Sequence, residues 1–159
     1  MPASEIRSTE LVSNDALYLD RQLCFSLYAC SRAMTKAHQP MLGELGVTYP
    51  QYLVLLVLWE CRDAKCDQVS VKELGERLRL DSGTLTPLLK RMEAAKLLCR
   101  SRDSVDERRV LVELTVKGVD LRILAQAFRS ENVPFDDAEL ARLSDLQQEL
   151  LCLLKVLPQ

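Results

Sequence analysis

Two stripes of apolar residues at helical spacing lie in the middle of the chain, and an alternating pattern follows them. The first stripe consists of Val71, Leu74 and Leu78, and the second of Leu85, Leu88, Leu89 and Met92. They predict two helices separated by a turn at residues 80–83. Val110, Val112 and Leu114 then alternate, which predicts a strand with residues 97–102 as its hairpin partner. This order predicts a winged helix-turn-helix, a mainly α fold with a small β wing.

The ends of these two helices carry their own signals. Ser70 and Glu73 stand at capping-box spacing, so the first helix should begin at Val71. Pro87 lies inside the second helical pattern, where it removes a backbone hydrogen bond and tends to kink the helix. We therefore expect either a bend or a late start of the second helix.

The face of the second helix opposite its apolar stripe is small, polar and basic. Such a face can approach a DNA groove closely, and Lys90 and Arg91 can reach phosphates or guanine edges. Arg108, at the tip of the polar turn 103–108, can enter a minor groove, with Asp106 as its ion-pair partner. The other interpretation is an ordinary solvated face. The residues expected to contact DNA or support that contact are Ser82, Thr84, Thr86, Lys90, Arg91, Asp106 and Arg108.

Charge is distributed unevenly along this acidic chain. From Ser70 to Gly118 it carries eleven Lys or Arg against eight Asp or Glu, a net charge of +3, whereas the remaining residues carry ten against fifteen, a net of −5. Because phosphate contacts depend on local positive charge, a pI near 5.5 does not exclude DNA binding. It predicts binding that is strongly sensitive to salt.

The flanking segments predict further helices and one arm. Residues 1–16 lack periodicity and predict a mobile arm. Four helices are expected, at residues 19–45, 51–61, 115–129 and from 136 or 137 to about 157, with breaks at 46–50 and at Pro134 and a polar loop at 62–68.

Length and composition predict one globular domain, which we place at residues 17–159. Its DNA-binding lobe should span about 50–115, with dimerisation helices at about 17–45 and 116–157. The last helix has a leucine stripe too wide for a small isolated helix to cover, and helix-turn-helix proteins commonly bind palindromes as two-fold dimers.

We find no signal-peptide pattern and no apolar run near 18 residues, so we expect a cytoplasmic protein without a membrane partner. Six cysteines in that reducing setting argue against a disulfide scaffold, and no metal or cofactor is expected.

Five long segments carry a resemblance to a known family. They are LCFSLY at 23–28, TYPQYLVLLVLWE at 48–60, VKELGERL at 71–78, LDSGTLTPLLKR at 80–91 and DERRVLV at 106–112. With these segments the chain resembles the MarR family of bacterial transcription regulators, and within it the organic-hydroperoxide-sensing (OhrR-like) branch. The resemblance implies a homodimeric repressor of operator DNA whose reactive Cys24 is oxidised by an organic hydroperoxide to a sulfenic acid and then to a disulfide that releases DNA.

The residues around Cys24 support that role independently. If the first helix starts near Asp20, Cys24 lies close to its positive end with Arg21 nearby, and both effects favour the peroxide-reactive thiolate. The other interpretation is a small buried hydrophobic residue. The family places two tyrosines of the partner subunit against this cysteine. Tyr49 matches one of them. His38 stands at the other position, a departure that replaces a phenol with an imidazole. The competing interpretation is that His38 is a partly exposed polar residue.

A second departure concerns the thiol that completes the disulfide. Two-cysteine members of the family use a cysteine near the end of the helix after the wing, but residues 125–133 contain none. Three outcomes stay open: a mixed disulfide with a low-molecular-weight thiol, which we favour, overoxidation, or a disulfide with another cysteine such as Cys152. Cys61 and Cys66 are expected to be exposed, incidental thiols rather than a metal or redox site.

Two other functions compete with the redox-switched repressor. One is a MarR-type regulator released by a small-molecule ligand, in which Cys24 is not the switch. The other is a thiol peroxidase, which would leave the basic wing without a purpose. We therefore expect a regulator and not an enzyme.

Overall fold

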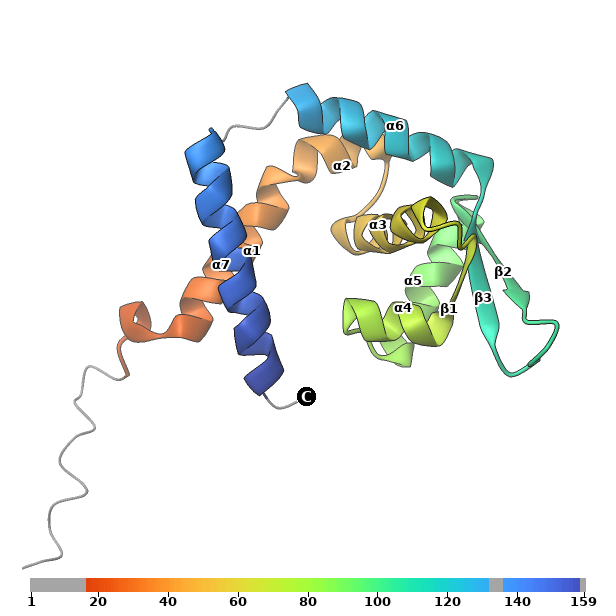
Figure 1. The fold of residues 1–159 in the computed structure, drawn as a ribbon, viewed down its shortest axis with the longest axis horizontal. Helices are drawn as coiled ribbons and strands as arrows, with labels where there is room; N and C mark the ends of the chain where they lie inside the picture. Colours follow the sequence, from red (N-terminus) through yellow and green to blue (C-terminus); the bar gives the residue numbers. More distant parts are fainter. Residues whose placement is uncertain (1–16, 132–135, 158–159) are drawn as a thin grey trace, which may run out of the picture. The chain divides into compact units, whose positions relative to one another are not determined.

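The computed structural model describes residues 17–131 and 136–157 of the chain. A short 3-10 helix, Leu19–Arg21, precedes the α-helices and strands (Figure 1). The α-helices are α1 (Leu23–Ala37), α2 (Gln39–Leu45), α3 (Tyr49–Asp63), α4 (Val71–Leu78), α5 (Ser82–Ala94), α6 (Val116–Glu131) and α7 (Asp137–Val156). The strands are β1 (Gln68–Ser70), β2 (Leu98–Arg102) and β3 (Val110–Leu114). This is the predicted winged helix-turn-helix. The expected mobile arm and the break at Pro134 lie outside the described residues.

A buried core forms where α3, α4 and α5 pack beside a small antiparallel sheet (Figure 1). The strand order is β1-β3-β2, with Val69 opposite Val112 and Arg100 opposite the same residue on the other side. Helix α3 is the central apolar element, because it buries Tyr52, Val54, Leu55, Val57, Leu58, Trp59 and Cys61. The two predicted stripes also face this core: Leu74 is buried on α4, and Leu85, Leu88, Leu89 and Met92 are buried on α5.

Three expected boundaries are wrong. The single helix predicted over 19–45 is interrupted at His38, because Pro40 in the first turn of α2 has no N–H to donate to the preceding turn. The expected break at 46–50 is shorter, since α3 already begins at Tyr49, with the Thr48 N–H donating to Gln51 Oε1 at 2.8 Å. The loop expected at 62–68 ends in β1, a strand too short to show periodicity in the sequence.

The second helix of the motif does not have the late start that Pro87 allowed us to expect. Helix α5 starts at Ser82, where the Asp81 carboxylate accepts the Thr84 N–H at 2.9 Å, and it continues through Pro87. The late start is therefore wrong. The predicted start of α4 at Val71 is confirmed, with Ser70 Oγ accepting the Glu73 N–H at 3.2 Å.

The chain divides into two compact units, with the boundary between Leu121 and Arg122 inside α6. In the first unit, Thr115 ties the start of α6 to the end of α5, because its hydroxyl donates to Lys96 O at 2.6 Å and accepts the Gly118 N–H at 3.2 Å. In the second unit, α7 begins with a capping box in which Asp136 and Glu139 each accept the other's backbone N–H. The predicted bounds of the last helix are confirmed.

Candidate DNA-binding surface and thiol sites

The turn between α4 and α5 is tight because a glycine lets the two helices approach each other. A Cβ at Gly75 would lie 3.0 Å from Leu80 O and 3.6 Å from Leu85 Cδ2. Arg79 ends α4 in the left-handed conformation, at φ 53°. Asp81 then begins α5, and hydrogen bonds from the N–H and the hydroxyl of Thr84 hold the pKa of the Asp81 carboxyl below its ordinary value. The helix-turn-helix geometry is thus fixed by local contacts.

The exposed face of α5 keeps the predicted basic residues available. Ser82, Thr84, Lys90 and Arg91 are exposed, and Thr86 is half-buried. Lys90 and Arg91 take part in no ion pair within the described parts of the chain. Two free cations next to three hydroxyl side chains are suited to phosphates and base edges.

The wing turn directs Arg108 outwards. Its side chain is 96% exposed, and its Nε lies 3.8 Å from Asp106 Oδ1, which is the expected ion pair. Asp106 Oδ1 also accepts the Arg108 N–H at 3.1 Å, and Asp103 forms an ion pair with Arg109 at 3.3 Å. Sequence reasoning missed the role of Arg109, which closes the turn and leaves Arg108 at its tip.

A second missed ion pair fastens the wing to α5. Arg100 of β2 contacts Glu93 of α5 with Nη2 at 2.5 Å and Nε at 3.0 Å, and the Arg100 N–H also donates to this carboxylate at 3.1 Å. These bonds lower the pKa of the Glu93 carboxyl, mainly through the side-chain hydrogen bonds from Arg100. The wing and α5 are therefore connected directly.

Cys24 lies in the first turn of α1 and is exposed in the single chain. Helix α1 starts at Leu23 rather than near Asp20, so Cys24 is its second residue. Sequence reasoning missed Tyr28 and Arg32, which follow Cys24 on the same face of α1 at intervals of four, a spacing visible in the sequence. Tyr28 accepts a hydrogen bond from Arg32 Nη1 at 2.9 Å, and the guanidinium carbon lies 5.6 Å from the Tyr28 ring centroid.

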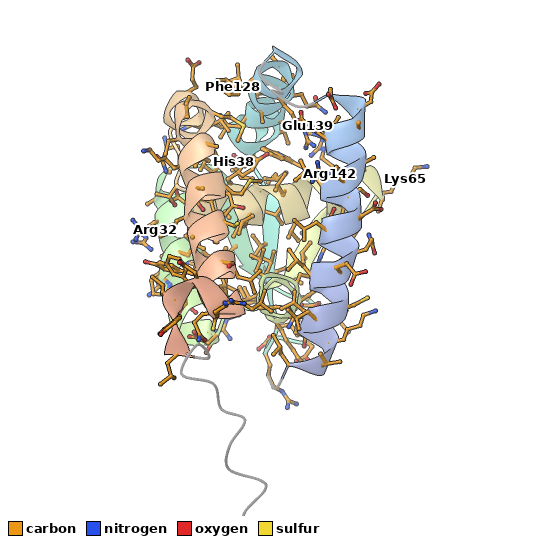
Figure 2. The ribbon with its side chains drawn as sticks, turned by 90° about the vertical axis from the view of Figure 1, so that its left-hand side faces the viewer. Arg32, His38, Lys65, Phe128, Glu139 and Arg142 are labelled. Atoms are coloured by element: carbon orange, nitrogen blue, oxygen red, sulfur yellow. The ribbon has the colours of Figure 1, made fainter. Side chains whose placement is uncertain are left out.

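His38 and Tyr49 meet at the other end of α1. Their ring centroids are 5.5 Å apart in an edge-to-face arrangement, and His38 also lies 6.3 Å from the ring of Tyr52. Arg32 and His38 are labelled along this part of the chain in Figure 2. His38 Nδ1 is 2.7 Å from Met34 O; because a carbonyl only accepts, Nδ1 carries the hydrogen. Fourteen residues separate His38 from Cys24, about 21 Å along a straight helix. One chain therefore brings His38 and Tyr49 together but not Cys24.

The remaining thiols have different surroundings. Cys152 is exposed on α7. Cys66 is exposed as expected, but Cys61 is buried, because it occupies the last inward-facing position of α3, where its sulfur meets Arg77. The expectation that both are exposed is wrong for Cys61. In the described residues no group of three or more His, Cys, Asp or Glu side chains is arranged to hold a metal ion.

The described helices include no single one long and apolar enough to cross a membrane. Helices α2 and α3 reach such a length and apolarity only when taken together, with a 72° bend between them. Most of that apolar surface belongs to the buried face of α3 described above.

The helix-turn-helix, its attached wing and the cations that they expose define a winged helix-turn-helix transcription regulator. The family profile described as transcriptional regulator SarA/Rot matches residues 36–122. The organic hydroperoxide resistance transcriptional regulator of Bacillus subtilis (strain 168) is 46% identical over 145 residues, which cover 91% of this chain and 95% of that protein. The chain therefore belongs to the SarA/Rot-type regulators and to the organic-hydroperoxide-sensing, OhrR-like branch of the MarR family.

Solved structures agree with this assignment. Reduced AbfR bound to DNA matches with a TM-score of 0.76 at 34% identity, covering 89% of this chain and 96% of that one. Overoxidised AbfR bound to DNA matches with a TM-score of 0.68 at 36% identity, covering 85% and 94%. AbfR is a protein of Staphylococcus epidermidis. The relatives are named as transcriptional regulators, and this chain is a DNA-binding regulator and not an enzyme.

Proposed function

We propose that this chain is a repressor that binds operator DNA as a homodimer and releases it when an organic hydroperoxide oxidises Cys24. The observation that carries the proposal is the exposed Cys24 thiol in the first turn of α1. The positive end of a helix stabilises a thiolate, which is the form that attacks peroxides. The name of the Bacillus subtilis relative, an organic hydroperoxide resistance regulator, supports the same signal.

The proposed DNA contacts come from two elements. Ser82, Thr84, Thr86, Lys90 and Arg91 would line the part of α5 that enters the major groove. Arg108 would enter the neighbouring minor groove, oriented by Asp106. The free cations on α5, the outward position of Arg108 and the DNA-bound AbfR relatives support this arrangement.

The proposed oxidation takes place in two balanced steps. The Cys24 thiolate attacks the distal peroxide oxygen, the O–O bond breaks, and after protonation an alcohol leaves with Cys24 as a sulfenic acid. A low-molecular-weight thiol then attacks that sulfur, and water leaves as a mixed disulfide forms. Residues 125–133 hold no cysteine, which supports a small thiol as the second partner; Cys152 is the alternative within the protein. Overoxidised AbfR was obtained bound to DNA, which favours a disulfide over an overoxidised thiol as the released form.

His38 and Tyr49 would meet Cys24 only across a dimer, since about 21 Å of helix separates His38 from Cys24 in one chain. We propose that they form part of the partner's cysteine pocket and respond to its oxidation. Residues 17–45 and 116–157 would supply the dimer interface, and 50–115 the DNA-binding lobe.

Releasing most of the bound operator requires roughly a hundredfold loss of affinity, about 2.7 kcal/mol. Repacking one dimer interface is sufficient for an energy of this size.

The test is fluorescence anisotropy of the reduced protein on its own upstream DNA. Binding is measured before and after a stoichiometric organic hydroperoxide with a small thiol, and Cys24→Ser is measured in parallel. We expect tight binding that oxidation weakens at least a hundredfold and reductant restores, with a response at least about tenfold smaller in the Cys24→Ser variant.

Equal binding before and after oxidation would remove Cys24 as the switch and favour the regulator released by a small-molecule ligand. Mass spectrometry of the oxidised protein separates the three fates of the thiol. A mass increase equal to the small thiol less two hydrogens identifies a mixed disulfide, added oxygen identifies overoxidation, and a crosslinked peptide containing Cys152 identifies a protein disulfide.

A further inference from the structure

The end of α3 folds back in one turn whose first and last residues are cysteines. The Lys65 N–H donates to Arg62 O at 3.0 Å, the Cys66 N–H donates to Cys61 O at 2.9 Å, and Lys65 has a φ of 60°. This pair of hydrogen bonds is the Schellman motif, which commonly brings the side chains of its first and last residues into contact. Those residues are Cys61 and Cys66. Disulfides join Cα atoms roughly 4.4–6.8 Å apart, a separation that suits residues joined by one backbone hydrogen bond.

The two thiols differ in access to solvent and in charge. Cys66 is exposed, and its Sγ donates to Gln68 O at 3.1 Å. Cys61 is 9% exposed, and its Sγ accepts a hydrogen bond from Arg77 Nη1 at 3.4 Å. Burial raises the pKa of the Cys61 thiol, the Arg77 charge opposes that shift, and a negative charge on Cys66 adds to it. An oxidant therefore reaches the exposed Cys66 first, whereas the buried Cys61 lies beside the Arg77 guanidinium.

Arg77 connects this pair to the helix-turn-helix. It lies on α4, and its Nη2 forms an ion pair with Glu60 of α3 at 2.5 Å while Nη1 contacts Cys61. Residues 68–70 after the cysteines form β1, and Ser70 caps α4. A covalent change at Cys61 therefore acts on one of the contacts that hold α4 against α3.

We propose that Cys61 and Cys66 form a reversible disulfide within one chain, a second thiol switch that acts directly on the helix-turn-helix. An organic hydroperoxide oxidises the Cys66 thiolate to a sulfenic acid and is itself reduced to an alcohol. The Cys61 thiol then gives up its proton as its sulfur attacks the Cys66 sulfur, the S–O bond breaks, and the departing oxygen takes up a proton and leaves as water. The new bond withdraws the Cys61 sulfur from Arg77. The site does not depend on Cys24.

Peptide mapping tests the bond in the full-length Cys24→Ser protein, which removes the other proposed reaction. The protein is treated with tert-butyl hydroperoxide, free thiols are alkylated, and trypsin is added. Cleavage after Arg62 and Lys65 separates peptide 37–62 from peptide 66–72, and each contains a single cysteine. We expect a linked pair of these peptides that disappears on reduction and is absent from a Cys24→Ser/Cys66→Ser control. Complete alkylation of both thiols after peroxide treatment would overturn the proposal.

Operator binding tests the link to the helix-turn-helix. If the disulfide moves Arg77 and with it α4, the helix-turn-helix fits its operator less well, and a tenfold loss of affinity corresponds to about 1.4 kcal/mol. We expect oxidised Cys24→Ser to bind operator about tenfold more weakly than the reduced form, with no change in the double variant. A mapped disulfide with unchanged affinity would overturn the switch. Every protein in these two experiments lacks Cys24, so neither the mapped disulfide nor the loss of affinity depends on whether Cys24 is the peroxide sensor.

Discussion

Among the glycines in the described residues, Gly118 is the one where an added methyl group would lie closest to a backbone atom. A Cβ there would lie 2.1 Å from Leu97 O and 2.9 Å from Leu114 Cδ2, whereas a Cβ at Gly43 on α2 would meet nothing within 4 Å. A clash with a backbone oxygen cannot be relieved by rotating a side chain. The absence of a side chain at Gly118 therefore lets α6 start against the strand that follows α5.

We predict that Gly118→Ala lowers the free energy of unfolding by about 3 kcal/mol, because α6 must move away from Leu97 and Leu114. Gly43→Ala is the matched control and should be neutral or stabilising by up to about 1 kcal/mol, since alanine favours helices over glycine. Urea unfolding followed by circular dichroism measures both. Equal midpoints for the two variants would contradict the contact at Gly118.

The Glu93–Arg100 pair predicts a pH dependence. The pKa of the Glu93 carboxyl is lowered in the folded protein, so its contribution to stability is present above the ordinary value of 4.5 and is lost as pH falls through the folded pKa. Glu93→Gln should therefore lose stability at pH 7, and its difference from the parent protein should shrink at pH 3. Urea midpoints at the two pH values check this. A difference that stays constant with pH would show that the carboxylate charge contributes nothing.

Single side chains were the hardest features to predict from sequence. The cap at Ser70 and the ion pair of Asp106 with Arg108 follow from local spacing and are present. Arg100 meets Glu93 only after the chain has turned from α5 into β2, and Cys61 becomes buried only when α4 packs on α3. Local charge patterns do not contain such tertiary information.

At the scale of elements, α5 tolerates a proline in its interior. Pro87 is exposed and lacks the N–H that would bond to Gly83 O, so it removes one helical hydrogen bond while its neighbours Leu85, Leu88 and Leu89 stay buried. Tertiary packing of the apolar stripe outweighs this local cost. For the same reason α5 begins at Ser82, with Asp81 as its cap, and not after the proline.

We predict that Pro87→Ala raises the free energy of unfolding by roughly 1–3 kcal/mol, because the missing hydrogen bond can form. Lys90→Ala, an exposed substitution one turn later, is the control and should change stability by less than about 0.5 kcal/mol. Thermal unfolding of the two variants gives the comparison. A Pro87→Ala protein that is no more stable than Lys90→Ala would indicate that α5 has adapted fully to the proline.

Periodicity predicted the long elements well and their interruptions poorly. Helices α4, α5, α6 and α7 and the hairpin follow the sequence pattern within a few residues. The break at His38 was missed because the apolar pattern continues across it, although Pro40 was the available signal. Strand β1 has three residues and is defined by pairing with β3 rather than by its own pattern.

At the scale of the whole molecule, the single chain exposes apolar surface that helical periodicity alone would place inside. On α7, Leu140, Leu143, Leu146 and Leu151 are all exposed, with Leu146 at 53%. On α1, Leu23, Phe25, Tyr28 and Met34 are also exposed. Apolar residues exposed along a helix mark a protein interface, which supports the proposed homodimer.

We predict that Leu146→Glu converts the protein to a monomer at micromolar concentration, because burying an unpaired carboxylate in an apolar interface is costly. Gln147→Glu adds the same charge at the adjacent exposed position and is the control. Sedimentation equilibrium determines the mass of each variant. A dimeric Leu146→Glu protein would place the interface elsewhere. Operator affinity should fall when dimerisation is lost, since a monomer contacts only one half-site.

The buried position of Trp59 gives this regulator an intrinsic optical probe. Trp59 is the only tryptophan in the chain, it is 4% exposed, and its ring lies 6.1 Å from that of Tyr52. Its Nε1 donates to Gly118 O at 2.9 Å, at the first turn of α6. The wavelength of indole emission follows the polarity around the ring, so a shift would report any loosening of this junction. Movement of α6 during oxidation can thus be followed in time on the unlabelled protein, while DNA is bound and as it is released.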